Sequence, residues 1–260
     1  MSYSDFYKLS YEMKGAILIT GVNGGIGRAI AEYSLSQGYV VFGVDTHNKT
    51  DLVLDAYWTI DLALLVDSVD LQNDLKKKIE HSLAKSQLKL TAVINNAAVQ
   101  ILGGVADVTM AEFLLTQKIN VAAPLLLTQL CLPSMSPREG SIINIGSIHA
   151  DLTKSKFVSY ATSKAALKGL TQAMAVDLAG YARVNCIEPA AIATPMLVDG
   201  FKATPEKFSE LEACHPSGEI GTPQQVAKMC VFLIDPEMSF LNGACIGLNG
   251  GIASRLHDPV

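Results

Sequence analysis

The stretch Thr20-Gly21-Val22-Asn23-Gly24-Gly25-Ile26-Gly27 lies between a short apolar run at residues 14–20 and a helical pattern at residues 28–37. A buried strand is therefore expected to lead into a glycine-rich loop and then into a helix. Glycines let a backbone turn tightly and approach a pyrophosphate, whose charge is met by amides and by the positive end of the helix. The pattern predicts a dinucleotide phosphate site, with an ordinary strand-to-helix turn as the alternative.

The next apolar run, residues 39–44, ends in an acidic residue, Asp45. This carboxylate follows the glycine loop by about twenty residues, the spacing at which it can accept hydrogen bonds from a ribose diol. A carboxylate there favours NAD over NADP. Asp45 is also well placed to cap the turn at residues 46–48, which is the alternative interpretation.

The rest of the chain alternates between short apolar runs and helical patterns. Further strands are expected at residues 57–60, 90–94, 140–145, 183–187 and 244–248, and further helices at 64–85, 109–132, 160–179 and 224–233. We expect Pro124 to kink the helix at residues 109–132. Asp61 either caps the helix that follows it or lies beside an adenine. This alternation predicts an α/β fold with a doubly wound parallel sheet.

The same pattern predicts one folded domain at residues 14–260, after an N-terminal extension at residues 1–13. The segment near residues 190–221 contains prolines and little periodicity, which is typical of a lid beside a site. We find no internal repeat.

Composition excludes several classes of function. The 260 residues are 49% apolar and 17% charged, with a net charge of −5, which argues against a nucleic-acid partner. The five cysteines show no C-x-x-C spacing, so we expect neither a metal site nor a disulfide framework. Residues 1–14 have no apolar core typical of a secretory signal, and no apolar stretch reaches the roughly 18 residues that span a bilayer. We therefore expect a cytoplasmic protein without a membrane partner.

Tyr160-Ala-Thr-Ser-Lys164 carries the best candidate for chemistry. A tyrosine and a lysine four residues apart share one face of a helix, so the ammonium is expected to favour the phenolate and to lower the pKa of the phenol from about 10. Small residues around the pair let a flat ligand approach. The pattern predicts a proton-transfer tyrosine, and an exposed helical pair is the alternative.

With these pieces in order, the chain resembles the short-chain dehydrogenase/reductase family from about Lys14 to Gly251. The resemblance rests on the motifs Thr20-Gly21-x-x-x-Gly25-x-Gly27, Asp45, Asn95-Asn96-Ala97, Asn120, Ser147, Tyr160-x-x-x-Lys164, the segment 185–194 with Pro189, and Asn249-Gly250-Gly251. It implies a single-domain, Rossmann-like sheet of seven parallel strands flanked by helices, and hydride transfer between a nicotinamide and an alcohol or carbonyl.

The resemblance also implies residue roles. Tyr160 is the acid/base, Lys164 assists it and holds the nicotinamide ribose, Ser147 binds the substrate oxygen, and Asn120 orders a water. Together with the glycine loop, it predicts a cofactor site made of Gly21, Asn23, Gly25, Ile26, Gly27, Asp45, Asp61, Leu62, Asn96, Ala97, Tyr160, Lys164, Pro189, Ile192 and Thr194. The implied substrate residues are Ser147, Tyr160, Gln100 and His149, although a surface-loop role for His149 is equally open.

The chain departs from the family pattern at four places, all in loops: Ala98, Ala190, Asn249, and the segment 178–184, which is about two residues short. We expect an NAD-dependent oxidoreductase that acts on a sugar, a polyol or a small hydroxy compound. The alternatives are a catalytically idle dinucleotide sensor and a 3-oxoacyl-thioester reductase. The resemblance further implies a homotetramer or homodimer, and we expect the apolar helices at residues 109–132 and 159–179 and the last strand to lie in the interfaces.

Overall fold

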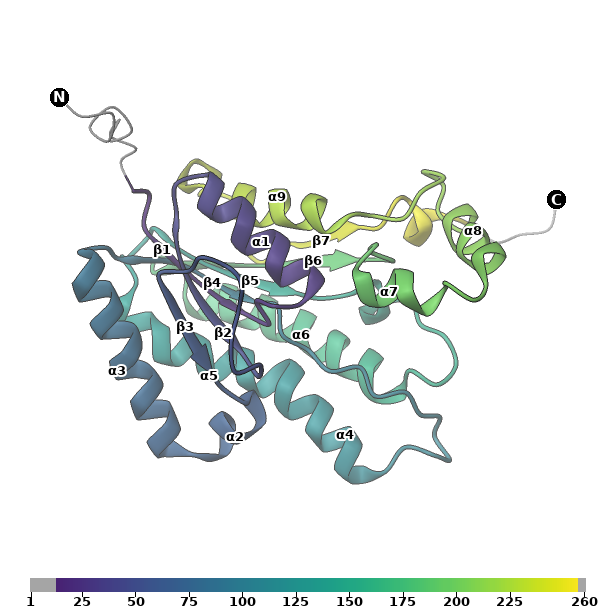
Figure 1. Ribbon diagram of the computed structural model, residues 1–260, viewed down its shortest axis with the longest axis horizontal. Helices are drawn as coiled ribbons and strands as arrows, with labels where there is room; N and C mark the ends of the chain where they lie inside the picture. The colour runs from purple at the N-terminus through teal and green to yellow at the C-terminus, as the bar shows by residue number, and fades with distance from the viewer. Residues whose placement is uncertain (1–12, 257–260) are drawn as a thin grey trace.

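The computed structural model describes residues 13–256 and contains one parallel sheet of seven strands in the order β3-β2-β1-β4-β5-β6-β7 (Figure 1). Apart from Met13, the N-terminal extension expected at residues 1–13 lies outside the described residues. The strands are β1 Ala16–Thr20, β2 Val40–Asp45, β3 Ala56–Thr59, β4 Leu90–Asn95, β5 Gly140–Ile145, β6 Ala182–Pro189 and β7 Cys245–Leu248. The predicted Rossmann-like α/β fold is confirmed.

Both faces of the sheet are covered, as Figure 1 shows. Helices α1 (Gly25–Ser36) and α9 (Pro223–Ile234) pack on one face, and α3 (Val69–Ser86), α5 (Ala123–Cys131) and α6 (Val158–Asp177) pack on the other. Successive residues of β1 alternate between the two cores: Leu18 belongs to one apolar cluster, while Ile17 and Ile19 belong to the other. Strands buried on both faces need apolar residues at every position, which explains the short uninterrupted apolar runs in the sequence.

Two of the predicted helices are interrupted. The helix expected at residues 64–85 is two helices, α2 (Leu62–Asp67) and α3 (Val69–Ser86). Ser68 between them has an extended backbone, and its hydroxyl accepts a hydrogen bond from the Leu71 amide. A serine can cap a helix better than it can continue one, which accounts for the break.

The helix expected at residues 109–132 is also divided. It consists of α4 (Met110–Gln117), a π-helical turn at Lys118–Ala122 and α5 (Ala123–Cys131). Pro124 lies in the first turn of α5, where its missing amide hydrogen costs little. The irregularity therefore precedes the proline, whereas we predicted a kink at the proline itself.

The segment predicted as a lid contains two short helices, α7 (Pro195–Gly200) and α8 (Pro205–Ala213). It approaches the glycine loop closely, because a Cβ on Gly25 would lie within 3.0 Å of both Thr194 and Pro195. Within residues 13–256, no helix has both the length and the apolar character needed to cross a bilayer.

Candidate active site

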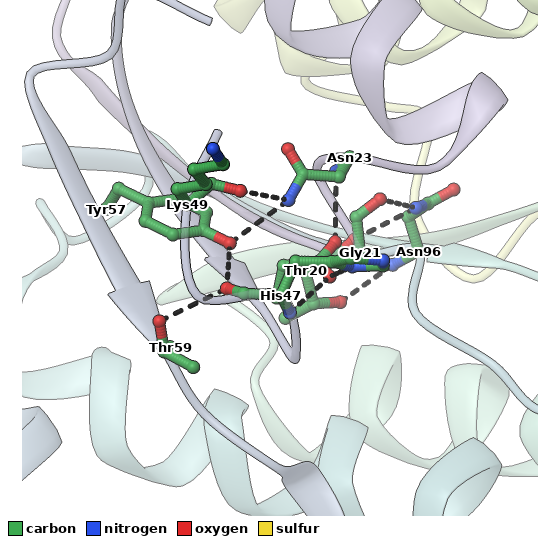
Figure 2. Close-up of polar contacts among 9 residues, drawn as sticks. Thr20, Gly21, Asn23, His47, Lys49, Tyr57, Thr59 and Asn96 are labelled. Carbon is green, nitrogen blue, oxygen red and sulfur yellow. Dashed lines mark hydrogen bonds and ion pairs between the residues drawn. The ribbon is translucent and has the colours of Figure 1, made fainter. Parts of the chain in front are cut away.

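The glycine loop and the Asn95–Ala97 turn lie side by side at the carboxyl edge of the sheet. They follow β1 and β4, the two neighbouring strands at which the strand order reverses. Thr20 Oγ1 accepts hydrogen bonds from the Asn96 amide at 3.1 Å and the Ala97 amide at 3.0 Å. In return, the Asn96 side chain donates to the carbonyls of Thr20 and Gly21 (Figure 2). Crevices at such points are where doubly wound sheets bind ligands.

The glycines of the loop are required by its geometry. Gly21 has a φ of +67°, and a Cβ on Gly27 would lie 2.0 Å from the Gly21 carbonyl oxygen. No side chain caps the amino end of α1, so its first amides are left to a ligand. This arrangement suits a pyrophosphate, which would be held by backbone amides at the helix end.

Asp45 is a buried carboxylate at the end of β2. Its Oδ2 accepts from the Asn23 amide at 3.0 Å, and its Oδ1 accepts from the His47 amide at 3.1 Å and lies 2.6 Å from His47 Nδ1. Burial raises the pKa of Asp45, but the hydrogen bonds from His47 and Asn23 outweigh it and leave the pKa below its usual value. The structure therefore has the turn-capping contact that was the alternative interpretation, on a carboxylate that also reaches the glycine loop.

A second set of contacts holds the loop after β2 against the glycine loop. The Asn23 side-chain amide donates to Tyr57 Oη at 3.0 Å and to the Lys49 carbonyl at 3.3 Å, and Tyr57 and Thr59 both donate to the His47 carbonyl (Figure 2). Among the described residues, Asn23 Oδ1 is a buried acceptor without a donor. A ligand hydroxyl at this edge would satisfy it.

Asp61 and Leu62 are occupied by structural roles. Asp61 caps α2, because its Oδ1 accepts from the Ala63 amide at 2.8 Å and the Leu64 amide at 3.4 Å. This is one of the two roles that its sequence position allowed. The Leu62 side chain is buried in the core beneath the sheet. Because it is buried, the Leu62 side chain is not free to make the predicted contact with a cofactor.

Ser147 and Tyr160 are brought together by β5 and α6. Ser147 follows β5 and caps the short helix Ile148–Ala150 by accepting from the His149 amide at 3.2 Å. The edge of the Tyr160 ring meets His149 at a centroid distance of 5.7 Å, and His149 stacks on Phe157 at 4.4 Å. The phenol is thus surrounded by a serine hydroxyl and two rings.

Lys164 lies below the Tyr160 ring, with Nζ 5.5 Å from the ring centroid. The side chain is buried, and Nζ donates to the Ile145 carbonyl at 2.7 Å. Burial lowers the pKa of Lys164 to about 8. Burial also raises the pKa of Tyr160, while a hydrogen bond with Ser147 lowers it. The expected fall of the phenol pKa below 10 is not present here, because burial outweighs the hydrogen bond with Ser147. The Lys164 ammonium is directed to the Ile145 carbonyl.

Asn120 lies on the π-helical turn and is buried. Its Oδ1 accepts from the Val99 amide, and its Nδ2 donates to the Val99 carbonyl and to Ser163 Oγ, each at 2.9 Å. The side chain therefore ties the loop after β4 to α6. Its water-ordering role stays a prediction, since these partners already engage both ends of the amide.

The residues expected along the nicotinamide side lie after β6. Pro189 ends that strand, Ile192 is buried and bridges to Gly221, and Thr194 caps α7 by accepting from the Leu197 amide at 3.3 Å. Thr194 also faces Gly25 of the glycine loop, while Ile26 is half-buried in that loop. The structure thus brings the segment predicted as a lid to the predicted phosphate site.

Of the two further substrate candidates, His149 is the one that contacts Tyr160. Its Nδ1 lies 3.1 Å from Thr153 Oγ1, and burial and the nearby Lys154 lower its pKa. Gln100 is exposed on the loop after β4. Sequence reasoning missed the stacking of Phe157 on His149, for which the sequence has no periodic or motif signal.

Comparisons with known proteins match nearly the whole chain. A family model described as enoyl-(acyl carrier protein) reductase matches residues 21–253. A 3-oxoacyl-[acyl-carrier-protein] reductase of Thermotoga maritima is 30% identical over 243 residues, 90% of this chain and 96% of that protein. The solved structure of an aldohexose dehydrogenase of Thermoplasma acidophilum has a TM-score of 0.84 at 28% identity, covering 95% of this chain and 96% of that one. A 4-hydroxyisoleucine dehydrogenase complexed with NADH has a TM-score of 0.81 at 25% identity, covering 94% and 100%.

Proposed function

Because the chain belongs to the short-chain dehydrogenase/reductase family, we propose that it is an NAD-dependent oxidoreductase that interconverts a secondary alcohol and its ketone. The observation that carries the proposal is the convergence of Ser147, Tyr160 and Lys164 beside the glycine loop, at one edge of the sheet. The alcohol class, namely a sugar, a polyol or a small hydroxy compound, accords with the structural likeness to an aldohexose dehydrogenase.

In the oxidation direction, Ser147 and Tyr160 hydrogen-bond the substrate hydroxyl, and Tyr160 accepts its proton. A bound nicotinamide would accept the hydride from the carbon that bears this hydroxyl. We assign to Lys164 the role of countercharge to the phenolate that forms during proton transfer, because its buried Nζ lies 5.5 Å from the centroid of the Tyr160 ring. In the reduction direction, Tyr160 returns the proton to the developing alkoxide.

The chain's own residues would hold the cofactor from three sides. The amides of the glycine loop and of α1 would meet the pyrophosphate, and Asp45 would accept hydrogen bonds from the adenosine ribose. Asn96, Ala97, Pro189, Ile192 and Thr194 would flank the nicotinamide half, and Lys164 would donate to its ribose. NAD rather than NADP follows from Asp45, since a 2′-phosphate would meet a like charge.

One alternative has a specific observation behind it. The Thermotoga maritima relative at 30% identity is a reductase of 3-oxoacyl thioesters. Such a substrate class is proposed second, because residues 22–26 contain no basic side chain that would receive the phosphate of NADPH. An idle dinucleotide sensor ranks third, because it would have no need of Ser147, Tyr160 and Lys164 together.

A spectrophotometric screen tests the proposal. The full chain is incubated with NAD or NADP and a panel of sugars, polyols and small secondary alcohols, and nicotinamide reduction is recorded. In a parallel arm, NADPH oxidation is followed with a 3-oxoacyl thioester. The proposal predicts turnover with NAD on at least one secondary alcohol. Turnover confined to NADPH and the thioester would establish the alternative instead.

A further inference from the structure

Two cysteines and a glutamate on the neighbouring strands β6 and β7 lie close together, next to the residues proposed for hydride transfer. Cys186 and Glu188 are two residues apart on β6, so their side chains project from the same face of the sheet. Cys245 on β7 is the register partner of Cys186, and Gly247, the partner of Glu188, places no side chain in between. The two sulfurs and a carboxylate oxygen all lie within 4.8 Å of one another.

Glu188 is the unusual member of this cluster. It is 6% exposed, and its Oε1 is a buried oxygen without a hydrogen-bond donor among the described residues. The nearest cation, Lys168 Nζ, forms an ion pair with Oε1 at 3.7 Å, which is too long for a hydrogen bond, and it donates its hydrogen bond to Asp151 Oδ2 at 2.5 Å. A buried carboxylate oxygen with no donor is costly unless something else binds it.

The thiols provide the complementary half of a site. Cys186 is buried and Cys245 is half-buried, so the cluster is closed on one side and reachable from the other. Thiolates and a carboxylate together are the donors that soft and borderline divalent cations prefer.

From this geometry, we propose that Cys186, Glu188 and Cys245 form a binding site for a thiophilic divalent cation such as Zn²⁺. Three protein donors leave one tetrahedral position for water. Coordination displaces the thiol protons to solvent and joins β6 to β7. The site is separate from the residues proposed for hydride transfer, but it adjoins them, because Cys186 Sγ lies against Gly146, which precedes Ser147.

The test uses the reduced full chain and Zn²⁺ alone, with binding measured by calorimetry and stability by thermal unfolding. Cd²⁺ is a second probe, because a Cd–thiolate bond has an ultraviolet charge-transfer band that reports sulfur ligation directly. The test variants are Cys245→Ser and Glu188→Gln, both close in size to the native residue. Cys214→Ser is the matched control, since Cys214 is an exposed thiol outside the cluster.

We expect the native chain and Cys214→Ser to bind one cation per chain, to show the thiolate band with Cd²⁺ and to unfold at a higher temperature with Zn²⁺. Cys245→Ser and Glu188→Gln should bind at least about tenfold more weakly, because each replaces an anionic donor by a neutral oxygen and even outer-shell changes cost that much. Native-like circular dichroism without added metal establishes that each variant is folded. Unchanged Zn²⁺ affinity in a folded Cys245→Ser, or loss of binding in Cys214→Ser, would overturn the proposal.

Discussion

At the scale of single residues, Asp45 has two roles that one experiment separates. Its carboxylate holds the Asn23 amide and His47, and we propose that it also excludes a 2′-phosphate. Asp45→Asn keeps an oxygen for the Asn23 amide and removes the charge. We expect it to shift the ratio of kcat/KM for NAD to that for NADP by at least about tenfold towards NADP, because a like-charge repulsion of over ~1.4 kcal/mol is lost.

The matched control for that measurement is Asp51→Asn, which removes an exposed carboxylate paired with Arg28 from the same loop region. It should leave the ratio of the two kcat/KM values unchanged. If Asp45→Asn also leaves the ratio unchanged, Asp45 is a turn residue alone.

Lys164 illustrates how a functional residue can reduce stability. Burial lowers its pKa from 10.5 to about 8, so the folded chain carries a buried charge below pH 8 that the unfolded chain carries in water. That pKa shift corresponds to a destabilisation of the folded chain by about 3 kcal/mol at pH 7. Removing the ammonium also removes its hydrogen bond to the Ile145 carbonyl, which offsets about 1 kcal/mol of the gain. We therefore expect Lys164→Met to abolish turnover and yet to raise the free energy of unfolding by about 2 kcal/mol at pH 7.

The sign of the pH dependence tests the cause. Between pH 8 and 10.5 the unfolded chain binds the extra proton, so the stability of the native protein rises with pH and the advantage of Lys164→Met disappears. Urea unfolding at pH 7 and pH 10 measures this. Lys168→Met, which removes a partly exposed lysine from the same helix, should show no such gain. A Lys164→Met protein less stable than the native one at pH 7 would contradict the account.

At the scale of elements, the strands follow directly from the sequence, whereas helix interruptions do not. Uninterrupted apolar runs mark strands buried on both faces, and each of those predicted corresponds to an observed strand within a few residues. Ser68 interrupts a helical pattern without changing its polarity, and the π-helical turn at Lys118–Ala122 depends on tertiary contacts of Asn120. The local periodicity of apolar residues therefore predicts neither the helix break at Ser68 nor the π-helical turn.

The candidate site was predictable only where its residues lie within one short segment of the sequence. Motifs on the chain gave Tyr160, Lys164 and the glycine loop, because each of these sits within one short segment. Cys186 and Cys245 are far apart in the sequence and meet only through the register of β6 and β7. Sequence spacing can detect residues that share one turn, but it cannot detect that two residues lie side by side on adjacent parallel strands, so the cluster in which we propose a metal site has no signal in the sequence.

The hydrogen bonds of Asn120, in the π-helical turn, should contribute measurably to the free energy of unfolding. Asn120→Ala leaves the Val99 amide and carbonyl and Ser163 without their partner, so we expect a loss of about 2–3 kcal/mol in the free energy of unfolding. Thr128→Ala is the control: Thr128 is also buried, but its hydroxyl only bonds the Pro124 carbonyl of its own helix, and about 1 kcal/mol is expected. Equal losses in the two variants, measured by urea unfolding, would argue against a bracing role for Asn120.

At the scale of the whole molecule, the helices around the π-helical turn leave apolar side chains uncovered. Met110 is 68% exposed, Leu114 57% and Leu125 38%, so neither the segment predicted as a lid nor the neighbouring helices cover them within one chain. We expect a homo-oligomer, a tetramer or a dimer, that uses α4 and α5. Light scattering at micromolar concentration measures the mass.

A surface variant locates that interface. Leu114→Glu combined with Leu125→Glu should reduce the oligomer to smaller species, because two carboxylates per chain cannot be buried against an apolar partner without a large cost. Val53→Glu is the control, since Val53 is an exposed apolar residue in a loop, 89% accessible, far along the chain from both helices. A native chain that is monomeric, or a Val53 variant that dissociates like the double variant, would refute this interface.

The account as a whole rests on proton transfer by Tyr160, and Tyr160→Phe tests it most directly, because the substitution removes one hydroxyl and retains the ring that packs against His149. The measurement compares kcat on the best alcohol of the screen with NAD affinity determined by titration of the same samples. The account predicts that kcat falls by at least about 10²-fold while NAD affinity stays within a few-fold of native. A Phe variant with near-native kcat would contradict it.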